Sequence, residues 1–418
     1  MRIPFQTLRW VLPLVWAALT VGASLAHRYA WGPFDPGVER SALLETVCIR
    51  VSNAAQVING PVWIASWLLV PHRAGLASAL VLHGVGFAGW IGCIWLALVA
   101  RRHLKTRSRQ APAEAIPTGA AVLSRRAFLA DSMLVTGVGC AGAGGVYSSC
   151  VEPWSLRVRR YSIPIAGMAP GLDGLRLVQL SDTHLGPRIP ASFIKEAVEL
   201  ARSLAPDLYL LTGDYVHNGV EYIEPAAALF RPLLEPRAGL IGTLGVLGNH
   251  DHYADAARMT AALTAVGVRM LDNARVFLDA KERRLSPILA HDDSLCIGGV
   301  GDLLEGTVEI NAALRDATPD IPRVLLSHNP DVAESRELAP GKGNRVDLMI
   351  SGHTHGGQVR LPLIGAPAVP SNYGSKYAHG LVQGPACPVV VSAGVGMSIL
   401  PVRFGVAPEV VEITLVSA

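Results

Sequence analysis

No Cys-x-x-Cys pair occurs among the six cysteines of this 418-residue chain. A zinc knuckle or a thioredoxin-like site is therefore not expected. A Gly-x-x-x-x-Gly-Lys-[Ser/Thr] loop is also missing, which argues against a P-loop nucleotide enzyme. The formal net charge is only +3, so we expect no nucleic-acid partner. Cys296 and Cys387 are read either as a disulfide or, the favoured alternative, as two buried free thiols.

Long apolar runs are few after Ser155 but frequent before it, although hydrophobic residues make up 50% of the whole chain. Residues 76–100 contain 25 residues with His83 as the only ionisable side chain. At ~1.5 Å per residue, a helix of this length exceeds a ~30 Å hydrocarbon core. We therefore predict a transmembrane helix there, a second at residues 11–26 between aromatic residues, and a weaker one at residues 54–70.

The segment after these runs carries signals for membrane topology. Five basic residues lie within residues 101–109, which predicts a cytoplasmic side for that cluster. Ser124-Arg125-Arg126-Ala127-Phe128-Leu129 resembles a twin-arginine export signal, and a plain membrane helix is an equal alternative. Either interpretation places the second half of the chain on the far side of the membrane. We predict a transmembrane region at 1–110, a linker with the signal or a further membrane helix at 111–153, and a globular domain at 154–418.

Strand-like and helix-like patterns alternate in the second half of the chain. Short apolar runs predict strands at residues 175–180, 208–211, 244–247, 295–300, 324–326, 348–350, 389–392 and 410–415. Helical spacing of apolar residues predicts helices at residues 192–204 and 256–266. This alternation indicates an α/β fold, which we interpret as two packed sheets with flanking helices.

Five polar signatures follow the ends of these predicted strands. They are Asp182-Thr183-His184, Gly213-Asp214, Gly248-Asn249-His250-Asp251, Ser327-His328 and Gly352-His353-Thr354-His355. Carboxylates, imidazoles and an amide carbonyl, with no thiolate, suit two divalent metals such as manganese, iron or zinc. Two such ions ~3.5–4 Å apart can promote an in-line phosphoryl displacement. The glycines next to these residues are expected to permit tight turns.

In their order and spacing, the five signatures resemble those of the calcineurin-like metallophosphoesterase superfamily, over residues 175–415. The resemblance implies a two-sheet β-sandwich with flanking helices and a site with defined roles. Asp182, His184 and His355 would bind the first metal, Asn249, His328 and His353 the second, and Asp214 would bridge them. His250 would stand beside the phosphate without binding metal, and Asp251 would orient it.

The residue types present also indicate how the phosphate ester bond would be cleaved. No signature supplies a serine or cysteine nucleophile with its base, so direct attack by hydroxide is favoured. An imidazole can donate a proton to the leaving oxygen near neutral pH. Four other histidines lack ligand spacing and are expected at the surface or beside the ligands: His217, His252, His291 and His379. Of these, His252 is the one most expected to line the pocket, because it follows Asp251 directly.

A narrower resemblance links the chain to bacterial membrane proteins with a carboxyl-terminal phosphoesterase domain. It is carried by Ser351-Gly352-His353-Thr354-His355-Gly356-Gly357-Gln358 and by the segment at 394–404. It implies a membrane-associated enzyme of a bacterial inner membrane, and some relatives in this branch act on UDP-2,3-diacylglucosamine. That lipid is handled in the cytoplasm, whereas the topology predicted from the basic cluster places the catalytic domain outside the cytoplasm. The apolar loop at residues 359–368 would either contact such a lipid or, the favoured alternative, pack in the core. A non-catalytic membrane sensor that retains the fold is the alternative function, and a transport component is a third.

Overall fold

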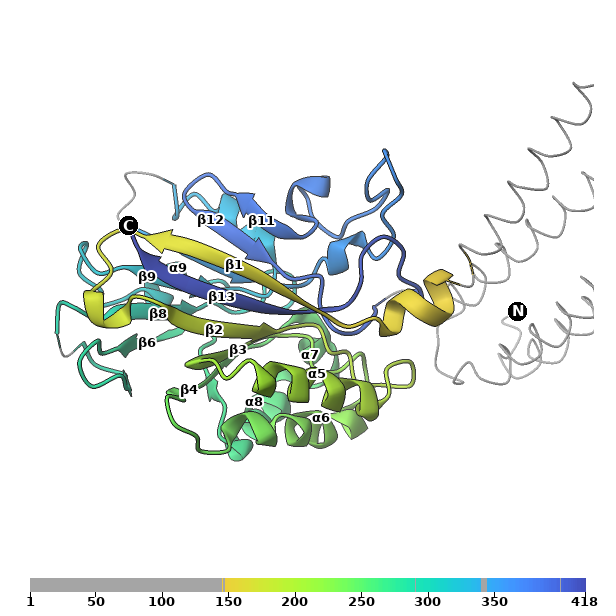
Figure 1. Cartoon of the computed structure of the whole chain (residues 1–418), viewed down its shortest axis with the longest axis horizontal. Coiled ribbons are helices and arrows are strands. Elements are labelled where there is room, and N and C mark those ends of the chain that lie inside the picture. The colour runs from red at the N-terminus through yellow and green to blue at the C-terminus, as the bar shows by residue number, and fades with distance from the viewer. Residues whose placement is uncertain (1–144, 146, 290, 340–343, 399) are drawn as a thin grey trace, which may run out of the picture. The chain divides into compact units, whose positions relative to one another are not determined.

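Two β-sheets facing each other form the body of this computed structural model, which describes residues 145, 147–289, 291–339, 344–398 and 400–418 (Figure 1). The predicted membrane segments and the twin-arginine-like motif lie outside these residues. Across the described ranges, no helix combines the length and the apolar character needed to cross a bilayer.

Each sheet mixes parallel and antiparallel neighbours. The first has the order β1 (Arg157–Ile165), β13 (Glu409–Ser417), β2 (Leu175–Leu180), β3 (Leu208–Thr212), β4 (Gly242–Val246) and β5 (Arg269–Met270). The second has the order β11 (Gly380–Gln383), β12 (Pro388–Val391), β10 (Leu348–Ser351), β9 (Arg323–Leu326), β8 (Leu295–Gly299), β6 (Ala274–Leu278) and β7 (Leu285–Ser286). Strands β2, β3 and β4 are parallel, as are β8, β9, β10 and β12, so their carboxyl ends share one edge of each sheet.

Strand β3 illustrates how the layers are held together. Leu208 and Leu210 pack in the core between the two sheets, whereas Tyr209 and Leu211 pack in the core on the outer face. Successive side chains of a strand point to opposite faces. A strand covered on both faces therefore reads as the continuous apolar run seen in the sequence.

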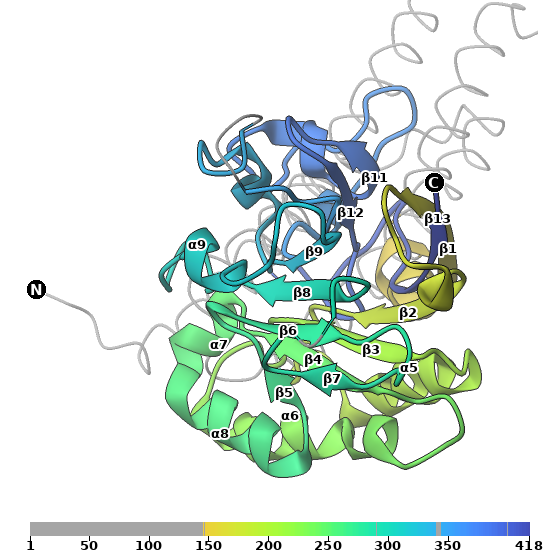
Figure 2. The ribbon, with the colours of Figure 1, turned by 90° about the vertical axis from the view of Figure 1, so that its left-hand side faces the viewer.

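Helices cover the outer faces of both sheets. α5 (Ala191–Ser203), α6 (Ile223–Leu229) and α8 (Ala256–Val266) lie on the first sheet, and the short α9 (Ile310–Ala313) packs against the second (Figure 2). The Asp255 side chain caps α8 by accepting a hydrogen bond from the Arg258 N–H, and Gly267 ends it in the left-handed conformation. The predicted α/β architecture of two sheets with outer helices is confirmed.

The two cysteines within this domain are not joined. Cys296 and Cys387 are both buried and both free. The disulfide alternative is therefore wrong, and the alternative of buried free thiols is confirmed.

Candidate metal centre

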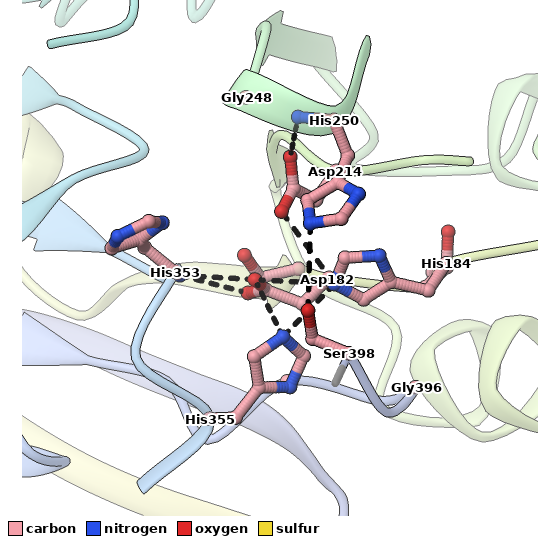
Figure 3. Close-up of polar contacts among 12 residues, drawn as sticks. Asp182, His184, Asp214, Gly248, His250, His353, His355, Gly396 and Ser398 are labelled. Atoms are coloured by element: carbon pink, nitrogen blue, oxygen red, sulfur yellow. Dashed lines mark hydrogen bonds and ion pairs between the residues drawn. The ribbon is translucent and has the colours of Figure 1, made fainter. Parts of the chain in front are cut away.

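The five polar signatures converge at the edge where the parallel strands end. Figure 3 shows the side chains of Asp182, His184, Asp214, His250, His353 and His355 around one centre. Asp182 and His184 follow β2, Asp214 follows β3, Asn249 opens α7 (Asn249–Ala254) after β4, His328 follows β9, and His353 and His355 follow β10. Ligands of open α/β sheets bind outside the carboxyl ends of the strands. The fold therefore brings together side chains that are up to 173 positions apart, from Asp182 to His355.

The first group of candidate ligands is Asp182, His184 and His355, all buried, with ligand atoms within 4.8 Å of one another. The Nε2 atoms of His184 and His355 are 2.9 Å apart. Oδ1 of Asp182 lies 3.4 Å from Nε2 of His355 and 4.0 Å from Nε2 of His184. These donors point at one another, as donors around a shared cation do.

The second group is Asp214, His328 and His353, also buried and within 4.8 Å of one another. Nδ1 of His353 lies 3.2 Å from Nε2 of His328. Oδ2 of Asp214 lies 3.3 Å from Nε2 of His328 and 3.5 Å from Nε2 of His184 in the first group. One carboxylate oxygen thus reaches both groups, which is the position that a bridging ligand needs.

Three of the four candidate imidazole ligands have a protonation state that suits metal binding. Burial lowers the pKa of His353 to about 3, with the charge of His328 adding to the effect. Burial also holds the pKa of His184 and of His355 well below the usual range. These rings are therefore neutral at pH 7, which is the form that binds a metal.

Asn249 provides a further test of whether these residues fit a bound metal ion. Its side chain is buried, and within the described part of the chain its Oδ1 atom has no hydrogen-bond partner. A buried carbonyl oxygen left without a partner is costly, by about 1–3 kcal/mol. A cation beside Asn249 would satisfy this oxygen, so the donor set fits two divalent metals.

Hydrogen bonds to the backbone fix several of these side chains. Nδ1 of His328 lies 2.8 Å from the Thr212 carbonyl oxygen, which leaves Nε2 facing Asp214. The Asp182 carboxylate accepts from the His353 N–H at 3.0 and 3.1 Å. Such outer contacts orient metal ligands and select their tautomers.

The backbone at the candidate ligands is strained. Five of them have positive φ: Asp182 (53°), His184 (48°), Asp214 (55°), His353 (71°) and His355 (51°). Non-glycine residues in this region cost of order 1–3 kcal/mol each and cluster at functional sites. The packing around the site must therefore hold these turns in place.

Two glycines beside the ligands are needed because a Cβ atom would collide with a neighbouring side chain, and a third adopts a tight turn. Gly248 has a φ of −113°, and a Cβ there would stand 2.3 Å from Oδ1 of Asp214. A Cβ on Gly352 would stand 2.0 Å from the Ser181 hydroxyl and 2.3 Å from Oδ2 of Asp182. The expected tight turn occurs at Gly213, whose φ is +89°.

His250 lies at the mouth of the site with its two ring nitrogens in different surroundings. Nδ1 is 2.5 Å from the His217 carbonyl oxygen, which can only accept, so Nδ1 carries a hydrogen. Nε2 faces the Ser398 hydroxyl at 3.4 Å. The His250 ring stacks on the His217 ring with a centroid distance of 5.0 Å. His250 thus lies beside His184 of the first group, with 4.7 Å between their ring centroids.

The expected role of Asp251 needs correction. Its two buried oxygens accept hydrogen bonds from the backbone N–H groups of Asp214, Tyr215, Val216 and Gly248, at 2.8, 2.9, 3.4 and 3.0 Å. The carboxylate thus holds the Asp214 loop against the start of α7. The His217 carbonyl, and not Asp251, orients the His250 ring.

The remaining histidines occupy different places. His217 lies in the site, where its ligand atom is within 4.8 Å of those of His184 and His250. His252 lines a separate cavity of about 680 Å³ with Asp272 and Asn273. His291 and His379 pair instead with Asp279 and Arg360, respectively.

Sequence reasoning missed the residues that close the site from the segment after β12. The Ser398 N–H donates to Oε1 of the buried Gln358 at 2.6 Å. The fully buried Arg403 donates through Nη2 to the carbonyls of Ala393, Gly394 and Gly396. These contacts hold the segment against Asp182, whose carbonyl accepts from the Gly396 N–H. Gln358, Ser398 and Arg403 all lie within residues 351–358 and 394–404, the two segments that carry the narrower resemblance. That position was the signal available in the sequence.

Comparisons with known proteins agree with this geometry. Residues 175–357 match the family model of the calcineurin-like phosphoesterases. The chain is 32% identical over 299 residues to the uncharacterized metallophosphoesterase YkuE of Bacillus subtilis, across 71% of this chain and 98% of that protein. It is 29% identical to the phosphodiesterase YaeI of Escherichia coli, across 71% of this chain and 100% of that protein. It is 30% identical to the UDP-2,3-diacylglucosamine pyrophosphatase LpxG of Chlamydia trachomatis, across 52% of this chain and 74% of that protein.

Proposed function

This chain belongs to the calcineurin-like phosphoesterase family and is a metal-dependent phosphoesterase, and from that premise we propose that it hydrolyses a phosphodiester or pyrophosphate bond of a lipid-linked substrate at a membrane. The observation that carries the chemistry is the reach of the Asp214 carboxylate to both buried groups of donors.

The metal ligands follow from the two groups. Asp182, His184 and His355 would hold one divalent ion, Asn249, His328 and His353 the other, and Asp214 both. When bound, two such ions lower the pKa of a water and offset the charge of the phosphoryl group. Manganese, iron and zinc all suit donors of this kind.

His250 is the proton donor in this proposal. Its Nδ1–H is held by the His217 carbonyl, so Nε2 is the atom that faces the site. A protonated imidazole can give its Nε2 proton to the leaving oxygen as the P–O bond breaks. The stacked His217 ring keeps the donor ring from rotating.

Water attacks directly in this proposal, without a covalent enzyme intermediate. Within the described residues, the hydroxyl beside His250 is that of Ser398, and 3.4 Å separates it from Nε2. Nucleophile and base are usually ~2.6–3.2 Å apart. The Ser398 N–H is also tied to Gln358, which holds the residue as part of the site's wall.

A lipid-linked substrate is supported by two features of the chain. Its sequence predicts membrane segments before the catalytic domain, and an apolar loop follows the His353–His355 turn. The substrate would be an acylated pyrophosphate of the same chemical class as the UDP-2,3-diacylglucosamine named for the Chlamydia relative.

We place the catalytic domain outside the cytoplasm, anchored in a bacterial inner membrane. The basic cluster at 101–109 and the twin arginines at 125–126 support this orientation. A reporter fused after Ser155 should be active only outside the cytoplasm, and one fused near Arg109 only inside. Replacing Arg125 and Arg126 by lysines should block export if the motif is a twin-arginine signal. Unchanged export would identify an ordinary membrane helix.

The activity test uses the full chain in detergent with added manganese. We expect hydrolysis of bis(p-nitrophenyl) phosphate and of CDP-dioleoylglycerol, an acylated pyrophosphate, and loss of both activities after chelation. Hydrolysis of the soluble ester alone would reject the lipid-linked substrate, and no hydrolysis of either would reject the proposed chemistry.

A further inference from the structure

An apolar hairpin tip projects from the domain six residues after His355. Its large side chains, Leu361, Leu363 and Ile364, have relative exposures of 37%, 109% and 73%, and together we call them the apolar tip. Two backbone hydrogen bonds between Leu361 and Gly365, of 2.8 and 2.9 Å, close the hairpin. The expectation that these side chains pack in the core is wrong, because the tight hairpin turns them outward.

We propose that the apolar tip inserts into the bilayer that holds the amino-terminal segments of this chain, and so seats the metal centre at the membrane surface. The inference rests on the proposed function only in taking the chain to be membrane-anchored. It adds a second, independent contact between the catalytic domain and the lipid.

The position of the tip relative to the incoming chain supports this proposal. The base of the hairpin is hydrogen-bonded to the segment after β12, since the Arg360 N–H donates to the Phe404 carbonyl at 2.6 Å. The Phe404 ring in turn meets the Tyr147 ring, with centroids 6.3 Å apart. Tyr147 begins the segment through which the chain comes from its predicted membrane helices. The tip and the incoming segment therefore belong to one side of the domain, the side toward which β2 points (Figure 1).

The tip is also coupled to the site. Gln358, three residues before Leu361, binds the Ser398 N–H through Oε1 and the Leu400 carbonyl through Nε2. Ser398 faces His250. Seating the tip in lipid would thus place the mouth of the site next to the headgroup layer, where a lipid-linked phosphate lies.

The chemistry of the tip favours lipid over a protein partner. Two neighbouring aliphatic side chains at the end of a narrow hairpin offer little area, whereas a specific protein interface buries about 800 Å² on each partner. The hydrocarbon layer of a bilayer can bury the apolar tip without a surface of complementary shape. Half-buried Arg360 at the hairpin base adds a positive charge at the level of anionic headgroups.

Spin labelling of the full chain tests insertion directly. The cysteines at 48, 93, 140 and 150 are replaced by serine, the buried Cys296 and Cys387 are left, and a nitroxide is placed at L363C. The protein is reconstituted in nanodiscs of phosphatidylethanolamine and phosphatidylglycerol. We expect collisions with oxygen to exceed those with a water-soluble nickel complex at position 363.

The matched control is I288C. Ile288 is an exposed isoleucine just after β7, which is joined through β6 to the amino end of β8, the end opposite the site. We expect the reverse ratio of collisions there. A water-exposed label at 363 overturns the proposal, and so does a label shielded from both reagents, which would indicate a protein contact such as a second copy.

Hydrolysis rates on a lipid substrate and on a soluble substrate separate this proposal from the proposed function. Leu363→Asn with Ile364→Ser keeps a residue that tolerates the positive φ of 67° at position 363. We expect at least a fivefold slower hydrolysis of CDP-dioleoylglycerol in nanodiscs and a change below twofold with bis(p-nitrophenyl) phosphate, whereas Ile288→Ser should change neither. Equal rates on the lipid would overturn a role in substrate access. An inserted label without lipid hydrolysis by the wild type would reject the lipid substrate and leave insertion standing.

Discussion

Asp251→Asn is the substitution that best distinguishes the observed role of this carboxylate from an orienting role toward His250. Each Asp251 oxygen accepts two backbone N–H groups, from the Asp214 loop and from Gly248. An amide nitrogen in place of either oxygen leaves two buried N–H groups facing a donor. At about 1–3 kcal/mol for each unsatisfied group, the local cost is about 2–6 kcal/mol.

This cost falls on the loop that positions the bridging carboxylate. We therefore expect Asp251→Asn to lose bound metal and to slow hydrolysis by a similar factor for all leaving groups. The assay is metal analysis of the full chain together with rates on aryl phosphodiesters whose leaving groups differ in pKa. The control is Asp255→Asn, which keeps a side-chain oxygen able to cap the exposed start of α8 and should keep both metals.

The outcome that would refute this reasoning is specific. If Asp251→Asn kept two metals and lost rate only with poor leaving groups, it would share the expected behaviour of His250→Ala. The carboxylate would then act through the proton donor, and the contacts to the Asp214 loop would be incidental.

Three further predictions test individual residues. His250→Ala should keep both metals and lose turnover most with poor leaving groups, whereas His353→Ala should lose metal. A missing ion in His250→Ala would show that His250 is a ligand. Ser398→Ala should keep its rate within about tenfold, and rapid-quench kinetics should show no covalent phosphoenzyme; abolished turnover would make Ser398 the nucleophile. Burial opposes a charge on His328, but Asp214 and Asp182 beside it raise its pKa well above the usual range, so a proton must leave before a cation binds. Metal affinity, followed by competition with a chelator, should therefore fall as the pH falls, and an affinity independent of pH would contradict this pairing.

The buried part of the fold could be predicted from the sequence because packing on both faces leaves a simple pattern. The apolar run at 208–211 corresponds to β3, and that at 324–326 to β9. Strand β1 was missed, since it lies at the edge of its sheet and carries the exposed Arg159 and Arg160, which pair with Glu409 and Glu412 of β13. Partners about 250 positions apart leave no local signal in the chain.

The site could be predicted in its residues but not in its supports. Asp182 and His353 stand in recognisable signatures, yet their positive φ values depend on tertiary packing. The group that orients His250 is the backbone carbonyl of His217, and a carbonyl is common to every residue. The outward turn of Leu363 likewise depends on a hairpin closed by backbone bonds, so composition alone favoured the core.

The most direct test of the central claim, hydrolysis at two metals joined by Asp214, is a metal titration of the full chain after chelation. Manganese content and hydrolysis of bis(p-nitrophenyl) phosphate are followed together in the wild type and in Asp214→Asn. The wild-type rate should rise until two ions are bound per chain. The variant should be at least about 100-fold slower, which corresponds to about 2.7 kcal/mol of transition-state stabilisation. Full activity without metal, or near-normal turnover of Asp214→Asn with two ions bound, would contradict the account.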